Sequence, residues 1–182
     1  MKILHTPQNM ANFATAQTGT IGFVPTMGNL HAGHASLLKC SVTENDITVL
    51  SVFVNAVQFN DTQDYEAYPK TMEQDVALAE SLNVDVIFAP CHTDLYPDNF
   101  TYQLHETDIS HTLEGEHRDG HFTGVLTVIM KLFNIVKPTR AYFGQKDWQQ
   151  LQLVKGMVNA FWLPTDIVAC PTVRDKNGLA LS

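Results

Sequence analysis

The sequence predicts an α/β protein built on a parallel sheet that helices cover on both faces. Short apolar runs rich in β-branched residues alternate with longer amphipathic stretches along the 182 residues, and strands that alternate with helices favour parallel pairing. Hydrophobic residues make up 45% of the chain and charged residues only 16%, a composition typical of a protein with a core. The length suits one domain, or one domain with a short appendage.

Five short apolar runs are expected to form the strands, at residues 20–25, 46–54, 84–89, 140–143 and 166–169. The first two read TIGFVP and DITVLSVFV, and the third, VDVIFA, is followed by a proline. Ligands of such sheets bind at the carboxyl ends of the strands. The chemistry is therefore expected in the loops just after Val24, Val54, Phe143 and Ala169.

Four longer stretches are expected to form helices, at residues 34–44, 71–83, 121–136 and 147–161. The second begins TMEQ, in which Thr71 and Gln74 suit a capping box. The third is apolar on nearly every side, so it is expected to be buried, and Pro138 stops it. Residues 91–120 are polar and irregular, with at most a short strand at 102–105.

Charge and composition argue against several classes of partner. The chain has 19 acidic and 11 basic residues, a formal net charge of −8, whereas nucleic-acid binders cluster Lys and Arg against phosphates. No apolar run approaches the roughly 20 residues of a membrane helix, and the N-terminus lacks a signal-peptide pattern. We expect a cytoplasmic protein without nucleic-acid or membrane partners, in which Cys40, Cys91 and Cys170 are buried free thiols.

The sharpest local signal is PTMGNLHAGH at residues 25–34, where an expected strand ends and an expected helix begins. Backbone N–H groups and the helix dipole make a helix start an anion site. Gly28 and Gly33 are expected to let a phosphate approach, and His31 and His34 to add donors aimed at it. Two surface histidines in a polar turn are the alternative. The coincidence of strand, turn and helix start favours the anion site.

A second motif, FGQKDWQQL, again follows a strand and opens a helix. Lys146 can reach a phosphate as a point charge, or be a solvated surface lysine. Asp147 suits a helix N-cap about as well as a direct ligand role. Gln149 or Gln150 could present an amide to a polar substrate.

A third motif, SVFVNAVQF, supplies two amides after a strand. Asn55 and Gln58 can bond a hydroxyl or carboxylate without adding charge, or they can simply form the turn. Weaker candidates are Arg118 and His121, the latter equally suited to capping a helix. Asp61, Asp64 and Glu66 could help to hold Mg²⁺, but acids in a polar loop usually just face water. The histidines expected on the surface are His5, His92, His105, His111 and His117.

Taken together, these segments resemble the pantothenate synthetase (pantoate–β-alanine ligase) family. The matching stretches run in the family's order from about residue 21 to the last residue: GFVPTMGNLHAGH, SVFVNAVQF, YEAYPKT, HRDGHFTGVLTVIMKLFNIVKP, AYFGQKDWQQL and PTVRDKNGLALS. The resemblance implies a Rossmann-like fold of the nucleotidylyltransferase superfamily with the HxGH signature. It also implies a ligase that uses ATP and Mg²⁺ to join pantoate to β-alanine through a pantoyl adenylate, typically as a homodimer.

The resemblance also assigns residues by motif. His34 would be the donor toward the α-phosphate, with His31 and Lys146 as further catalytic groups, and it leaves the metal ligands unknown. Gln58 and Gln150 would hold pantoate, and Gln58 would also lie beside β-alanine. The expected ATP-binding residues are Met27, Gly28, Asn29, Leu30, His31, Ala32, Gly33, His34, Gly144, Gln145, Lys146, Asp147, Val173, Leu181 and Ser182.

The chain also departs from the family's pattern. Ala56 stands where the family usually has proline, and residues 114–120 read EGEHRDG where a Cys-Gly and an Arg-Pro-Gly are usual. Residues 1–182 are expected to form the nucleotide-binding domain alone, without the family's small C-terminal lid domain.

Three alternatives remain. Another HxGH nucleotidylyltransferase would prefer a phosphorylated acceptor and need more basic residues. A truncated nucleotide-binding module would bind ATP without turnover. A fragment of an aminoacyl-tRNA synthetase fits the acidic charge least.

Overall fold

A single parallel sheet of six strands forms the centre of the computed structural model, which describes residues 1–182. The strands are β1 (Lys2–Leu4), β2 (Ile21–Thr26), β3 (Ile47–Val52), β4 (Val86–Phe88), β5 (Arg140–Gly144) and β6 (Asp166–Cys170). Their order across the sheet is β1-β4-β3-β2-β5-β6, and every pairing is parallel. The chain moves from β2 to β3 and β4, then returns to the other side of β2 with β5 and β6. The order therefore reverses between β2 and β5, the switch point where such sheets bind ligands.

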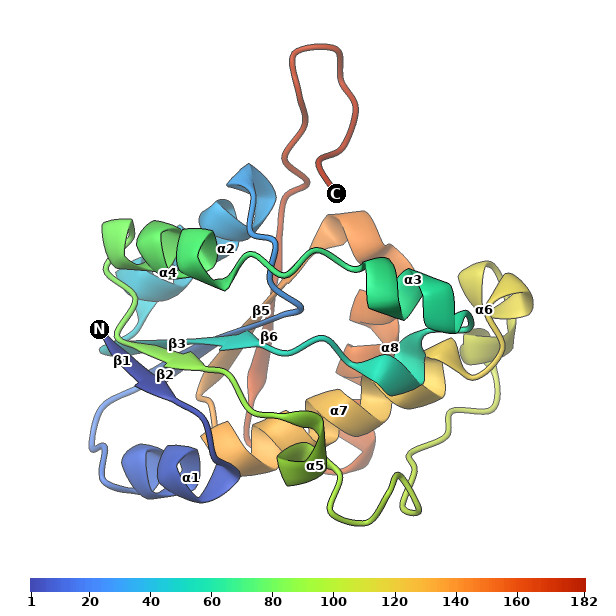
Figure 1. Ribbon diagram of the computed structural model, residues 1–182, viewed down its shortest axis with the longest axis horizontal. Helices are drawn as coiled ribbons and strands as arrows, with labels where there is room; N and C mark the ends of the chain where they lie inside the picture. Colours follow the sequence, from blue (N-terminus) through green and yellow to red (C-terminus); the bar gives the residue numbers. More distant parts are fainter.

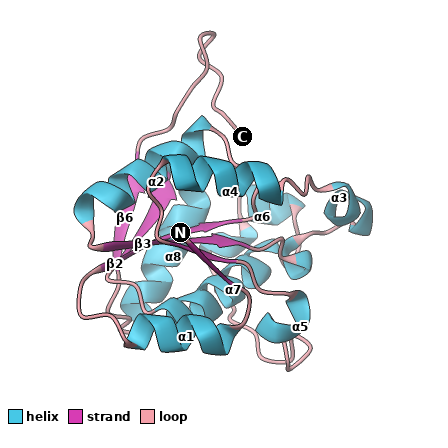
Figure 2. Cartoon of the chain, turned by 60° about the vertical axis from the view of Figure 1, so that its left-hand side comes forward, coloured by secondary structure: helices cyan, strands magenta, loops and turns pink.

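Helices cover both faces of this sheet (Figures 1 and 2). They are α1 (Pro7–Thr15), α2 (Ala32–Glu44), α3 (Thr62–Ala67), α4 (Met72–Ser81), α5 (His92–Leu95), α6 (Glu114–His117), α7 (His121–Val136) and α8 (Trp148–Ala160). Short 3₁₀ turns are η1 (Ala56–Gln58), η2 (Ile109–His111) and η3 (Gln145–Asp147). Helices α2 and α4 lie on one face and α1 and α7 on the other (Figure 1). None of the helices combines the length and apolar character that a membrane span requires.

The two-residue period of the strands divides the core into two clusters. Along β2, Phe23 packs into the larger cluster with α1, α7 and α8, whereas Val24 packs into the smaller one with α2 and α4. Along β5, Phe143 and Tyr142 divide in the same way. Because side chains alternate across a strand, a sheet covered on both faces needs apolar residues at every position. This is why the strands read as continuous apolar runs.

The expected elements are largely confirmed, and α7 matches the expected helix 121–136 residue for residue. The N-terminal β1 and α1 were not expected. The strand is only three residues long and lies at the edge of the sheet, so it carries little periodic signal. The only local signal for helix α1 is its N-terminus. Thr6 is the N-cap, its hydroxyl accepts a hydrogen bond from the Asn9 N–H, and Pro7 is the first helical residue.

Two smaller expectations were wrong, whereas residues 102–105, for which at most a short strand was expected, form none. The capping box of Thr71 with Gln74 is also absent, because the Thr71 hydroxyl donates instead to the carboxylate of Asp75, 3.2 Å away. All three cysteines are free, yet only Cys170 is buried: Cys40 is partly exposed and Cys91 is exposed.

A buried hydroxyl on β3 gives a test of the core. The Oγ of Ser51 is wholly buried and has no hydrogen-bond partner, and an unpaired buried hydroxyl is destabilising. We expect Ser51→Ala to leave the free energy of unfolding unchanged or to raise it by roughly 1 kcal/mol. The matched control is Ser41→Ala, because the Ser41 hydroxyl bonds that of Thr48 at 2.8 Å. The control should lose about 1–3 kcal/mol in urea unfolding. A loss of that size in Ser51→Ala would show that the Ser51 hydroxyl does have a hydrogen-bond partner.

Candidate active site

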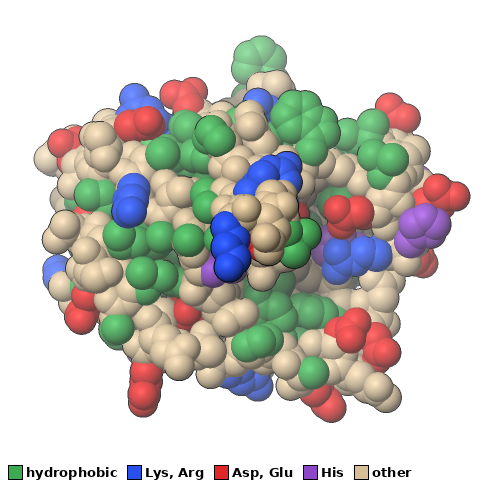
Figure 3. Space-filling model, turned by 90° about the horizontal axis from the view of Figure 1, so that it is seen from above, with side chains coloured by type: hydrophobic (Ala, Val, Ile, Leu, Met, Phe, Trp, Pro, Cys, Tyr) green, Lys and Arg blue, Asp and Glu red, His purple; other side chains and the backbone are tan.

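Three adjoining cavities lie at the carboxyl ends of the strands, as expected for a sheet of this topology. Met27 and Asp147 line all three. We name them the apolar cavity, of about 170 Å³, the histidine cavity, of about 230 Å³, and the outer cavity, of about 250 Å³. Seen from this end, the molecule is hollowed beside the projecting C-terminal segment, with basic side chains at the rim (Figure 3).

The apolar cavity combines a hydrocarbon wall with a few polar groups. Its wall is formed by Pro25, Phe53, Val125, Val128, Ile129, Leu132 and Phe143, from β2, β5, α7 and the loop after β3. The amides of Gln58 and Gln150 face this wall, and His34 lies at its border with the histidine cavity. A pocket of this kind suits a small ligand with an apolar body and hydroxyl or carboxylate oxygens.

The histidine cavity lies across the switch point. His31, Gly33 and His34 come from the start of α2, after β2, while Gly144 ends β5 and Lys146 follows it. The segment after β6 adds Pro171, Thr172, Val173, Leu181 and Ser182. A helix N-terminus, a lysine and two histidines thus face one space, which is the chemistry expected around a phosphate.

The two histidines cap α2 reciprocally, and this sets their tautomers. His31 Nδ1 accepts from the Gly33 N–H at 3.0 Å, and His34 Nδ1 accepts from the His31 N–H at 3.3 Å. An imidazole nitrogen that accepts a hydrogen bond carries no proton, so the neutral ring holds its proton on Nε2. Each ring therefore offers an Nε2–H donor.

Burial keeps both rings neutral. The pKa of His34 falls to about 4, first because the ring is desolvated and then because His31 lies beside it, with Asp75 and Asp147 opposing the shift. The pKa of His31 is also lowered, by burial and by Lys146. Near neutral pH the turn thus supplies hydrogen-bond donors rather than cations, and Lys146 supplies the charge.

The low pKa of His34 predicts a loss of stability in acid. In the unfolded chain His34 binds a proton below the ordinary histidine pKa of about 6.5. In the folded chain it binds that proton only below about pH 4. The contribution of His34 to the free energy of unfolding is therefore complete above pH 6.5 and is lost as the pH falls from 6.5 to about 4. Urea unfolding should show the wild type losing roughly 2 kcal/mol more than His34→Gln between pH 7 and pH 5. Equal losses would contradict a buried neutral His34.

A buried carboxylate holds the turn before these histidines. Asp75, only 2% exposed on α4, accepts from the N–H groups of Asn29 and Leu30 at 3.0 and 2.8 Å. The glycines of the turn make room for neighbouring side chains. A Cβ on Gly28, where φ is +84°, would lie 3.0 Å from the Asp75 carboxylate, and one on Gly33 would lie 2.7 Å from the His31 ring.

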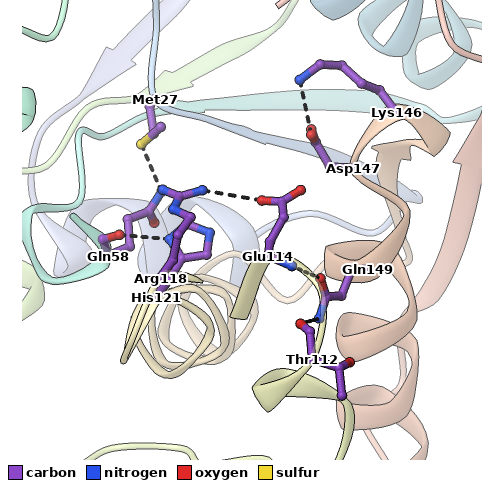
Figure 4. Close-up of polar contacts among 9 residues, drawn as sticks. All are labelled: Met27, Gln58, Thr112, Glu114, Arg118, His121, Lys146, Asp147 and Gln149. Carbon is purple, nitrogen blue, oxygen red and sulfur yellow. Dashed lines mark hydrogen bonds and ion pairs between the residues drawn. The ribbon is translucent and has the colours of Figure 1, made fainter. Parts of the chain in front are cut away.

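A chain of hydrogen bonds orients the amide of Gln58. The carbonyl of Gly124 can only accept, so it selects the Nδ2 end of Asn55, 3.2 Å away. Asn55 Oδ1 then accepts from the Tyr96 hydroxyl at 2.9 Å, and Nδ2 donates again to Gln58 Oε1 at 3.1 Å. The Gln58 Nε2 group faces Met27 and the cavities as a donor (Figure 4). Asn55, 1% exposed, thus positions Gln58 from within the protein.

The outer cavity is the most polar of the three. It brings together Lys146 and Asp147, whose charged atoms lie 3.1 Å apart, and the more exposed pair Arg118–Glu114, at 3.4 Å. Gln58 and Gln150 border it on the side of the apolar cavity. His121 lies behind Arg118 (Figure 4) and is not the cap of α7, a position held by Gly120.

Most of the expected site residues meet at these cavities, and a few do not. Asp147 stands at the N-cap of α8 without a side-chain capping bond. Gln149 is buried and bonds loop carbonyls at Ile109 and Thr112, which leaves Gln150 as the amide at the cavities. The expected residues that lie in the same turns without lining the histidine cavity are Gly28, Asn29, Leu30, Ala32 and Gln145.

Other candidates lie away from the site. The five histidines expected on the surface are all exposed. Asp61 caps α3 through the Gln63 N–H, and nowhere in the chain do three His, Cys, Asp or Glu side chains form a group that could hold a metal. The geometry therefore gives no support to Asp61, Asp64 and Glu66 as Mg²⁺ ligands, the weaker of the two interpretations that the sequence allowed.

Sequence reasoning missed Asp75, Tyr68 and Tyr96. Tyr68 lines the apolar and histidine cavities, and burial with the nearby Asp75 carboxylate raises the pKa of its hydroxyl. It lies in YEAYPKT, a stretch that stood out for its family resemblance alone. Asp75 looked like an ordinary solvated acid of a helix, and only its burial reveals its role.

A family model, curated relatives and solved structures all connect this chain to one enzyme family. The sequence model of the family described as pantoate-beta-alanine ligase matches residues 2–182. A pantothenate synthetase of Bdellovibrio bacteriovorus is 54% identical over 181 residues, which cover 100% of this chain and 72% of that protein. A crystal structure of pantoate-beta-alanine ligase from Francisella tularensis, complexed with beta-gamma ATP and beta-alanine, superposes with a TM-score of 0.97. It is 44% identical, and the match covers 100% of this chain and 71% of that one.

A crystal structure of pantothenate synthetase from Thermus thermophilus has a TM-score of 0.94 at 44% identity, with 66% of that chain covered. The likeness in fold extends over the whole of this chain, and the identity is far above the level at which only a fold is shared. The chain therefore belongs to the pantoate–β-alanine ligase family.

Proposed function

We propose that this chain condenses pantoate with β-alanine, using ATP, by way of a pantoyl adenylate. The observation that supports this most strongly is the junction of the apolar and histidine cavities. They meet at Met27, His34, Tyr68 and Asp147, so an acid in one and a nucleotide in the other would have their reacting groups side by side. Pantoate, with two methyl groups, two hydroxyls and a carboxylate, suits an apolar wall faced by Gln58 and Gln150.

In the first step the pantoate carboxylate attacks the α-phosphate of ATP and pyrophosphate leaves. The nucleophile belongs to the substrate, so the protein's task is to bring two anions together and to stabilise the charge that grows on the phosphate. We assign the Nε2–H groups of His31 and His34 to that charge, and Lys146 to the phosphates. Gln58 and Gln150 would hold the acid in line.

In the second step the amine of β-alanine attacks the acyl carbon and AMP leaves. The outer cavity adjoins the apolar one through Gln58 and Gln150, so we place β-alanine there. Its Arg118 and Lys146 suit the carboxylate of an amino acid, and Glu114 and Asp147 suit the ammonium group.

We propose that Mg²⁺ enters with ATP as part of the substrate. Because no three acidic or histidine side chains form a metal group, the ion would be held mainly by phosphate oxygens. This is the usual way in which proteins bind nucleotide magnesium. Asp147, which lines all three cavities, is the carboxylate best placed to assist.

Residues 1–182 would form the nucleotide-binding, adenylate-forming domain. A homodimer is supported by family resemblance and by exposed aromatic side chains such as Trp162, 92% exposed. The free cysteines and the use of ATP favour the cytoplasm.

Exchange of labelled pyrophosphate into ATP tests the proposal. We expect exchange that requires pantoate and is unaffected by omission of β-alanine, because only the first step is reversible in this way. Exchange driven instead by a phosphorylated acceptor would favour another nucleotidylyltransferase. ATP binding without any exchange would favour a nucleotide-binding module.

A further inference from the structure

The single histidine of the outer cavity, His121, has its proton placed by the backbone. It is the first residue of α7 and is 6% exposed. Its Nδ1 lies 2.8 Å from the carbonyl oxygen of Gln58. A carbonyl oxygen can only accept a hydrogen bond, so Nδ1 must carry the proton. In the neutral ring the lone pair is then on Nε2.

The Nε2 atom of His121 is open to the outer cavity. It has no hydrogen-bond partner in the chain, since the ring's one bond is made by Nδ1. Yet the only wholly buried side-chain nitrogen or oxygen without a partner is Ser51 Oγ, so Nε2 is not wholly buried. Because His121 lines the outer cavity, that cavity is where a ligand reaches the lone pair.

The ring remains neutral in its surroundings. Burial lowers the pKa of His121, and the Arg118 guanidinium lowers it further, whereas the bond to Gln58 and the carboxylates of Glu114 and Asp147 act in the opposite sense. Lys146 is the remaining cation of the cavity. A neutral imidazole with an accessible lone pair can accept a proton near neutral pH.

The tautomer of His121 is thus the opposite of that of His34. At His34 the proton is on Nε2 and Nδ1 accepts a backbone bond, which makes the ring a donor. At His121 the proton is on Nδ1, which makes Nε2 an acceptor. The two half-reactions need these two properties in turn, a donor for the charge growing on a phosphate and an acceptor for a proton leaving an amine.

We propose that His121 is the general base of amide formation, an inference that rests on the proposed function. The amine nitrogen of β-alanine bonds to the acyl carbon, the π pair of the carbonyl moves onto its oxygen, and the nitrogen, now cationic, becomes strongly acidic. Its N–H bond breaks, the proton passes to His121 Nε2, and the electron pair remains on nitrogen. The pair on the oxygen then re-forms the carbonyl as the C–O bond to the phosphate breaks, AMP leaves with that bond's electron pair, and Nε2 returns the proton to water.

The same ring also has a structural contact, the bond that ties η1 to α7. His121→Asn separates the two roles, because the asparagine Nδ2 occupies nearly the position of the histidine Nδ1 and can donate to the same carbonyl. Asparagine cannot accept the proton. The matched control is His117→Asn, four residues earlier, where the side chain is exposed on α6 and lines none of the three cavities.

Single-turnover reaction of the chain with pantoyl adenylate and β-alanine measures the step. Amide formation by the wild type tests the proposed function, and the variant rate relative to it tests His121. We expect His121→Asn to be slower by about 10²-fold, at the lower end of the range for general bases. Pantoate-dependent pyrophosphate exchange, which involves no amine, should stay within about twofold. Equal loss in both steps, or a full amide-forming rate, would overturn the assignment.

The tautomer can be read without turnover. Long-range ¹H–¹⁵N correlation spectra at pH 7.5 should show His121 protonated on Nδ1 and bare on Nε2, with the Nε2 signal shifting when β-alanine is added beside an adenylate analogue. A proton on Nε2, or a cationic ring, would overturn the proposal whatever the rates are.

Discussion

Replacing His34 by alanine is expected to slow pantoyl-adenylate formation by roughly 10²–10³, the usual effect of losing one donor to a developing oxyanion. His34 lies where the apolar and histidine cavities meet, and its Nε2–H is directed by the bond that Nδ1 accepts from His31. The carboxylate and the α-phosphate would react at this border. Pantoate-dependent pyrophosphate exchange measures the effect.

Two variants control this experiment. His34→Gln places an amide N–H near the lost donor and should recover part of the rate. His117→Ala removes an exposed histidine that lines none of the three cavities and should leave the rate unchanged. An unaltered rate in a folded His34→Ala protein would remove His34 from its assigned role.

Replacing Gly124 by alanine is expected to weaken binding of the acid by more than tenfold. Gly124 is where α7 crosses η1, and a Cβ there would lie 2.7 Å from the Val57 carbonyl oxygen and 2.9 Å from the Gln58 Cα. Backbone atoms cannot rotate away, so η1 must shift, and with it the amide that faces the apolar cavity. Overpacking of this kind also costs about 1–3 kcal/mol of stability. Isothermal titration with a pantoyl-adenylate analogue and urea unfolding measure both effects.

The matched control is Gly156→Ala. Gly156 is also a helix glycine, in α8, but a Cβ there would meet nothing within 4 Å. Alanine is the better helix former by about 0.5–1 kcal/mol, so this variant should be more stable and bind the analogue as the wild type does. Similar behaviour of the two glycine variants would show that the crossing at Gly124 does not position Gln58.

Much of the fold could be predicted because the strands are buried on both faces. The continuous apolar runs at β2, β3 and β4 and the apolar helix α7 carry strong local signals. β1 pairs only with β4, at the sheet edge, and its place is decided by a partner more than 80 residues away. Local patterns contain no information about such a pairing.

The same distinction between local signals and distant partners applies to the residues of the site. His31, His34, Lys146 and Gln58 could be predicted because they follow strands whose carboxyl ends share one edge. The roles of Asp75 and Tyr96 could not, since each depends on burial and on partners far along the chain. Nor could the tautomers of the histidines, which are set by single backbone atoms.

The most direct test of the central claim is a titration of the purified chain with a stable analogue of pantoyl adenylate, beside AMP. In the proposed site the analogue would span the histidine cavity and the apolar cavity, whereas AMP would fill only the first. We expect the analogue to bind at least about tenfold more tightly than AMP, a difference of roughly 1.4 kcal/mol. Equal affinity for both ligands, in a chain shown to be folded, would contradict it and leave only a general nucleotide site.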